Sequence, residues 1–143
     1  MNEVPFFVKR LIDQRDLLRF FERELGLSCD SILHPKDTAL AFLMTIEHDE
    51  GFRHYVYLFW REGPVFDKSL AQLAQIFADE FATEILFESE SSIADTSAEE
   101  WQLAVPGGSG PAVVTVIELA DGIDVANTSC SIVTGDPLMP SRK

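Results

Sequence analysis

The second half of the chain almost entirely lacks positive charge. Of the 143 residues, 24 are Asp or Glu and 11 are Lys or Arg, which gives a formal net charge of −13. Residues 1–68 carry 12 acids and 9 bases, whereas residues 69–141 carry 12 acids and no Lys or Arg. Such asymmetry indicates a positively charged partner more than it indicates a fold. It also argues against nucleic-acid binding, which needs a basic surface.

Cysteine and long apolar segments are also scarce. The two cysteines, Cys29 and Cys130, make no disulfide framework. We expect reduced thiols in a cytoplasmic protein, and a single Cys29–Cys130 disulfide is the less favoured alternative. The longest apolar run, residues 39–46, is too short to span a bilayer, and the first ten residues do not have the pattern of a secretory signal. We therefore expect no contact with a membrane.

Hydrophobic periodicity and turn residues predict six elements in the order strand, helix, strand, strand, helix, strand. They are expected at residues 5–12, 14–25, 38–46, 52–60, 70–82 and 83–88. Asp13 and Ser69 are the predicted N-caps, and Gly26 ends the first helix. This order is typical of the split βαβ arrangement. It predicts an α+β, ferredoxin-like βαββαβ core with two helices on one face of an antiparallel sheet.

Further antiparallel strands are expected after this core. They are predicted at residues 101–105, 112–119 and 123–126, with turns at 106–111 and at Asp121-Gly122. The length suits a single α+β domain over residues 1–130, followed by a flexible tail over residues 131–143. The residues expected in the core are Leu17, Phe21, Phe42, Leu58, Leu73, Phe77, Ile85 and Phe87.

No set of residues specifies a reaction. His48 and His54 flank a predicted turn, but two histidines without a third ligand are a weak signal for a metal. Cys29 has no nucleophile signature around it. The glycine-rich residues 106–111 lack the Lys-Ser/Thr of a phosphate loop and do not open a helix. We predict no catalytic residue, no metal and no cofactor, and hence no enzyme.

The strand at 52–60 is unusually aromatic. Tyr55, Tyr57 and Phe59 fall on one face of it, and Val56, Leu58 and Trp60 fall on the other. One face must meet the helices, and the other is an apolar surface unless something covers it. Monomers seldom expose large apolar patches, so we expect the C-terminal strands to cover it, with a second copy as the alternative. The sequence leaves open whether the protein is a monomer or a homodimer.

Residues 78–101 concentrate the negative charge. Asp79 and Glu80 end a predicted helix, where they oppose its dipole, and Glu84 and Glu88 share one face of a strand. A solubilising surface is one explanation, and Lys9 or Arg10 on the first strand is placed to neutralise Glu88. The complete absence of bases instead favours a surface that attracts a basic protein. Its predicted residues are Asp79, Glu80, Glu84, Glu88, Glu90, Asp95, Glu99 and Glu100, with Trp101 as an aromatic anchor.

The arrangement resembles the immunity proteins of bacterial polymorphic and contact-dependent toxin systems. The resemblance lies in a strand leading into "DQRDLLRFFERELGL", a central hairpin, and "SLAQLAQIFADEFATEILFESE" followed by "EEWQLAVPGG", and it covers most of residues 5–120. It implies a cytoplasmic protein that binds and neutralises a cognate basic toxin domain, often a nuclease. Such families share no motif, so no residue role is carried over.

Two other functions remain open on the sequence. A secretion chaperone is also small and acidic, and it would hold an extended effector segment on a hydrophobic face. A small-molecule sensor or enzyme on the same fold would instead need a deep polar pocket at His48 or His54.

Overall fold

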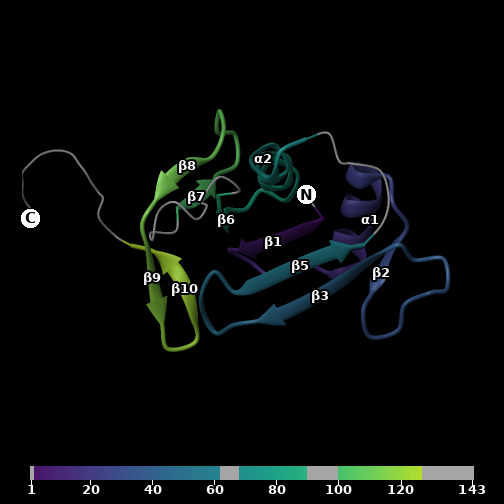
Figure 1. Cartoon of the computed structure of the whole chain (residues 1–143). Coiled ribbons are helices and arrows are strands. Elements are labelled where there is room, and N and C mark those ends of the chain that lie inside the picture. The colour runs from purple at the N-terminus through teal and green to yellow at the C-terminus, as the bar shows by residue number, and fades with distance from the viewer. Residues whose placement is uncertain (1, 62–67, 90–99, 127–143) are drawn as a thin grey trace, which may run out of the picture.

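The described residues of the protein form two helices and two β-sheets (Figure 1). The structure, a computed structural model, describes residues 2–61, 68–89 and 100–126. The helices are α1 (Gln14–Leu25) and α2 (Leu70–Phe81). The strands are β1 (Glu3–Val8), β2 (Cys29–Ser31), β3 (Ala41–Glu47), β4 (Glu50–Gly51), β5 (His54–Trp60), β6 (Ile85–Glu88), β7 (Trp101–Ala104), β8 (Ala112–Val114), β9 (Val116–Leu119) and β10 (Gly122–Val125).

The larger sheet has seven strands in the order β2-β3-β5-β1-β6-β7-β8. All its neighbours are antiparallel except β2 and β3, which pair in parallel from Cys29↔Ala41 to Ser31↔Leu43. The sheet is therefore mixed rather than wholly antiparallel. The α+β class and the two helices are as predicted.

The prediction of a single strand at residues 112–119 is wrong. The chain divides there into β8, which pairs with β7 in the larger sheet, and β9, which pairs with β10 in a separate sheet ordered β4-β10-β9. In that small sheet β4 and β10 run in parallel and approach closely. A Cβ at Gly51 would lie 2.2 Å from the Ile123 carbonyl oxygen, and one at Gly122 would lie 2.3 Å from that of Glu50. Both positions require glycine.

The helix ends follow the predicted capping residues. Asp13 precedes α1, and Gly26 ends it in the left-handed conformation at φ 70°, with its N–H donating to the Glu22 carbonyl. Ser69 begins α2 with a complete capping box, in which its side chain accepts from the Gln72 N–H and the Gln72 side chain accepts from the Ser69 N–H. No helix in the described ranges has the length and apolar content needed to cross a bilayer.

Both helices pack on one face of the larger sheet. Their apolar stripes form a single buried cluster with alternate residues of the central strands, such as Val4, Phe6 and Val8 on β1. Seven of the eight predicted core residues are buried there, all but Phe42. Phe42 lies on the opposite face and is only half-buried, because its neighbours Ala41 and Leu43 are the β3 residues that turn towards the helices.

The small sheet covers one end of the opposite face. Phe52, Leu86 and Ile123 form a second buried cluster there, and Phe7 and Trp101 are among the half-buried residues packed against it. Among the described residues, the C-terminal strands therefore cover one end of the face, as part of the cover that was expected from the chain itself. The rest of this face, on β1, β3 and β5, is called the open face below.

Candidate functional site

A row of aromatic rings runs along the open face. The Tyr55 and Tyr57 rings stack at 6.2 Å between centroids, and the Tyr57 and Phe59 rings stack at 5.6 Å. The neighbouring strands add Phe42, 5.7 Å from Phe59, and Phe7, 4.6 Å from Tyr55. We call these five residues the aromatic ladder. Their rings are only half-buried, so each keeps part of its surface in contact with solvent.

The ladder follows from the pleat of β5. His54, Val56, Leu58 and Trp60 are buried towards the helices. Side chains alternate between the faces of a strand, so the intervening Tyr55, Tyr57 and Phe59 must point the other way. The sequence predicted which residues of β5 share each face. Which face remains open depends on where β9 and β10 pack.

Two carboxylates lie at the ladder. The Tyr57 hydroxyl donates to Glu3 Oε1 at 2.6 Å, and this hydrogen bond, with a smaller effect of burial, raises the pKa of Tyr57 to about 12. Burial raises the pKa of Tyr55, and the charges of Glu3 and Glu88 raise it further. Both phenols are therefore neutral at pH 7, and the carboxylates add negative charge beside their rings.

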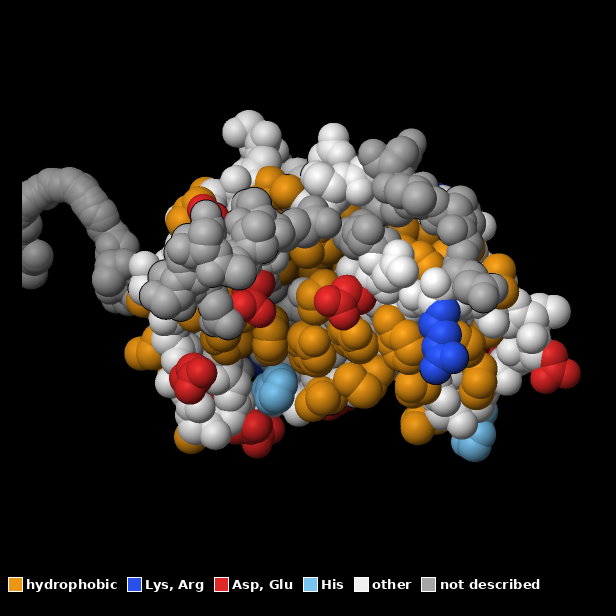
Figure 2. All heavy atoms as spheres, viewed as in Figure 1, with side chains coloured by type: hydrophobic (Ala, Val, Ile, Leu, Met, Phe, Trp, Pro, Cys, Tyr) orange, Lys and Arg blue, Asp and Glu red, His pale blue; other side chains and the backbone are white. Residues whose placement is uncertain are grey.

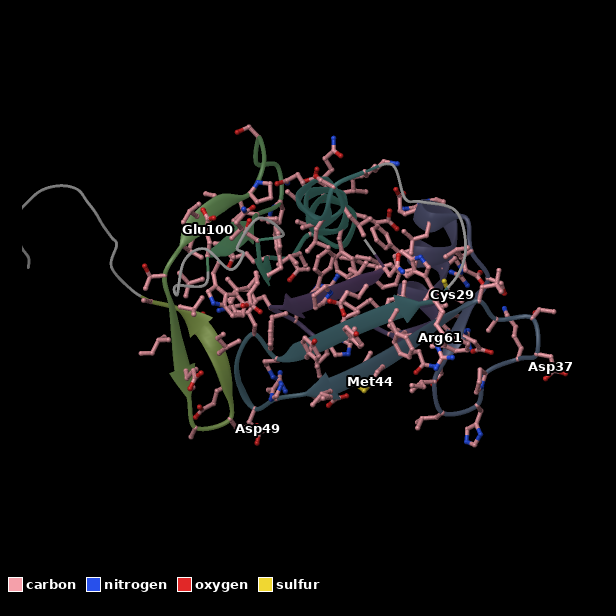
Figure 3. The ribbon with its side chains drawn as sticks, in the orientation of Figure 1. Cys29, Asp37, Met44, Asp49, Arg61 and Glu100 are labelled. Carbon is pink, nitrogen blue, oxygen red and sulfur yellow. The ribbon has the colours of Figure 1, made fainter. Side chains whose placement is uncertain are left out.

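The space-filling view shows this surface as a largely apolar band that carries charged groups. Hydrophobic side chains gather over β3 and β5 in Figure 2, with acidic groups among and beside them and a basic group near one end. Arg61 lies at the far end of β5, and Met44 lies along β3 (Figure 3). Ile46, which shares this face of β3, is 44% exposed. An apolar band of this kind is typical of a protein-binding surface.

The predicted acidic surface is divided between the two sides of the protein. Asp79 accepts a hydrogen bond from the Gly107 N–H at 2.8 Å, which ties α2 to the turn between β7 and β8, and another from Gln75 Nε2 within α2 at 3.0 Å. Glu80 forms a two-pronged ion pair with Arg23 of α1, with Nη1 at 3.2 Å from Oε2. Both residues thus have partners within the chain, which accounts for carboxylates in the last turn of a helix.

Three other members of the acidic run, Glu84, Glu88 and Glu100, are in the described residues, at β6 and β7. Glu88 is exposed, and its register partner on β7 is Trp101, whose ring lies 5.9 Å from that of Phe7. Glu84 is half-buried just before β6, and Glu100 is exposed just before β7. Glu90, Asp95 and Glu99 lie outside the described residues, as do Cys130 and the predicted tail.

The two bases that were predicted on the first strand follow the end of β1 at Val8, and they have partners other than the proposed Glu88. Lys9 pairs with Asp124 of β10 at 3.4 Å, and Arg10 Nη2 donates to the Phe81 carbonyl at 2.6 Å. Glu3 was not among the predicted site residues, because the first strand was expected to begin at Pro5. The alternation of β1 could have identified it, since Glu3 lies two residues before Pro5 and therefore on the same face as Pro5 and Phe7.

We expect the Arg23–Glu80 pair to contribute little to stability. Its side chains are 52% and 37% exposed, so water screens their attraction. A double-mutant cycle with Arg23→Ala and Glu80→Ala, followed by urea unfolding, should give a coupling energy below about 1 kcal/mol. A coupling of several kcal/mol would show that the contact holds the two helices together.

The histidines and Cys29 do not form a reactive group. His48 Nδ1 lies 3.5 Å from Asp121 Oδ1, whereas His54 is buried and its Nδ1 accepts from the Ile12 N–H at 3.1 Å. In the parts of the chain that the structure describes, no three His, Cys, Asp or Glu side chains are placed to share a metal. Burial raises the pKa of the Cys29 thiol to about 12, so it is not a thiolate at neutral pH.

No known protein family, curated protein or solved structure matches the chain. The assignment of a function therefore depends on the geometry and charge of the open face.

Proposed function

We propose that the chain is an acidic protein-binding module that receives a basic partner on its open face. The observation that carries this proposal is the aromatic ladder with Glu3 bonded to Tyr57 at its centre. Aromatic faces attract guanidinium and ammonium groups, and carboxylates beside them add ion pairs. Tyrosine is also among the residues that dominate binding energy at protein interfaces. The surface thus combines apolar contact area with a preference for positive charge.

We further propose that the protein acts as an immunity protein, in the cytoplasm, by occupying the basic site of a toxin domain. The net charge of −13 supports this role because it accelerates encounter with a basic partner. The neighbour order β3-β5-β1-β6, antiparallel throughout, supports a ferredoxin-like assignment for the core. Under this proposal the partner loses its activity when bound, and the chain itself catalyses nothing.

A secretion chaperone is the second candidate, and the apolar width of the open face favours it. A chaperone would hold an extended segment of its partner without blocking a catalytic site. The two functions differ in one measurement, which is the activity of the purified partner with and without a stoichiometric amount of this protein. Loss of partner activity supports the immunity function, and unchanged activity supports the chaperone.

Charge reversal beside the ladder tests the role of the acidic groups. We expect Glu88→Lys to slow association with the purified partner at low salt and to weaken its dependence on ionic strength, because charges steer association over roughly 8–10 Å. Asp37→Lys makes the same change in net charge in an exposed loop at the β2 end of the protein (Figure 3). Stopped-flow association across a salt series should separate them. If the two variants changed the association rate equally, Glu88 would act only through its contribution to the net charge and not through its position beside the ladder.

A further inference from the structure

A pocket of about 370 Å³ lies on the helix side of the sheet, away from the open face. It is formed where the chain leaves β1 and begins α1, against the hairpin end of β3 and β5. The residues that line it are Leu11, Ile12, Asp13, Gln14, Thr45, Glu47 and His54. None of the residues of the aromatic ladder lines this pocket.

His54 supplies a hydrogen-bond donor to the pocket. The residue is only 5% exposed, and its Nδ1 accepts from the Ile12 N–H. Burial lowers the pKa of His54, an effect that the nearby Glu47 opposes only in part, so the ring is neutral at pH 7. A neutral imidazole whose Nδ1 accepts must carry its proton on Nε2. Across residues 2–61, 68–89 and 100–126, Ile12 is the one hydrogen-bond partner of this ring, which leaves Nε2–H available to a ligand.

The rim of the pocket carries carboxylates, which accept hydrogen bonds and attract positive charge, whereas His54 donates. Glu47 lies directly across the hairpin from His54, and Asp13 makes no side-chain cap to α1. Both are exposed, and the lining contains no Lys or Arg. A ligand that suits the whole pocket therefore places an acceptor at His54 and a positive charge at the rim.

The edge of β3 continues this site. β2 pairs with β3 only as far as Leu43, whose carbonyl accepts from the Ile32 N–H on the outer side of the sheet. Backbone groups alternate in direction along a strand, so those of Thr45 and Glu47 face the same outer side. No described strand lies beside them there. Extended peptides bind such edges by adding a strand.

We propose that the pocket and this edge bind an extended basic segment of the partner protein. A carbonyl oxygen of the segment accepts from His54 Nε2–H, and an arginine or lysine side chain pairs with Asp13 and Glu47. The proposal rests on the proposed function in taking the partner to be basic, and it adds a second contact on the other side of the sheet. The edge of β3 joins the two sides, so a single segment can reach both.

The binding of Nα-acetyl-arginine N-methylamide tests the pocket, followed by the imidazole ¹⁵N resonances of His54. We expect saturable shifts of His54 Nε2 at millimolar concentration. The affinity should fall at least fivefold in Glu47→Gln and in Asp13→Asn, and it should be unchanged in Glu118→Gln, which removes an exposed carboxylate on β9. Nα-acetyl-norleucine N-methylamide keeps the carbonyl groups but lacks the charge, and it should bind at least fivefold more weakly.

An absence of shifts at His54, or equal binding of the two probes, would overturn the proposal. Free arginine carries a carboxylate in place of the amide carbonyl. If it bound more tightly than the amide, the site would belong to a small amino acid rather than to a peptide. Tyr57→Ala should leave the probe affinity unchanged, because Tyr57 lies on the open face. Failure of the pocket is therefore distinguishable from failure of the open face.

Discussion

Phe77→Ala is expected to lower the free energy of unfolding by about 3–5 kcal/mol. Phe77 is fully buried in the centre of α2, and its ring lies 4.6–5.6 Å from those of Phe81, Phe20 and Phe6. It therefore contacts β1, α1 and its own helix at once. Its removal leaves a cavity that none of these elements can fill without disturbing the others.

Urea unfolding followed by circular dichroism measures this loss. Phe42→Ala is the matched control, because it removes the same side chain from the half-buried open face. We expect it to cost less than half as much, since a solvated ring loses fewer contacts and leaves no closed cavity. A cost of Phe42→Ala equal to that of Phe77→Ala would contradict the division into a packed helix side and an open face.

Tyr57→Ala is expected to weaken partner binding by about 2 kcal/mol or more, which is roughly 30-fold. Tyr57 lies between Tyr55 and Phe59 in the ladder, and it is the residue that holds Glu3 against the rings. Its loss removes a large contact surface and also frees Glu3 from its fixed position. Phe59→Ala removes contact surface but leaves Glu3 in place, so it should weaken binding less than Tyr57→Ala does.

Isothermal titration calorimetry with the purified partner gives these affinities. Leu33→Ala is the control for the loss of exposed apolar surface, because Leu33 is 78% exposed in the loop after β2. We expect no measurable change in its affinity. Unfolding curves of each variant must remain close to that of the wild type. Tyr57→Ala with wild-type affinity would exclude the ladder from the interface.

The parts of the fold with local signals were predictable. Ser69, Gln72 and Gly26 set helix boundaries through contacts within a few residues, so sequence alone indicated both helices. The Asp121-Gly122 turn was predictable for the same reason. β2 was missed because three residues are too few to show an alternation.

The boundary between β8 and β9 had no local signal. Residues 112–119 have strand-forming character throughout, and the change of sheet at Thr115 depends on the distant partners β7 and β10. The partners of Asp79 and Glu80 could not be predicted from the sequence for the same reason. Gly107 and Arg23 lie far from them in sequence, so only the packing of α2 against α1 and the β7–β8 turn brings them together.

Part of the candidate site was predictable from the sequence. The alternation of β5 predicted that Tyr55, Tyr57 and Phe59 share a face. A basic partner, inferred from the missing Lys and Arg, stays a prediction. The sequence could not show that Glu3 joins the ladder, because that contact depends on the register of β1 against β5. Nor could it show how far β9 and β10 extend over the face.

Hydroxyl-radical footprinting of the protein, alone and with its partner, tests the open face most directly. The oxidation rates of Met44, Tyr57 and Phe59 report the solvent contact of the face, and those of Leu18 and Phe81 report the helix side. We predict that the partner slows oxidation of the first three residues severalfold and leaves the last two unchanged. Protection of the helix side with unchanged rates at Met44, Tyr57 and Phe59 would contradict the assignment of the open face as the binding surface.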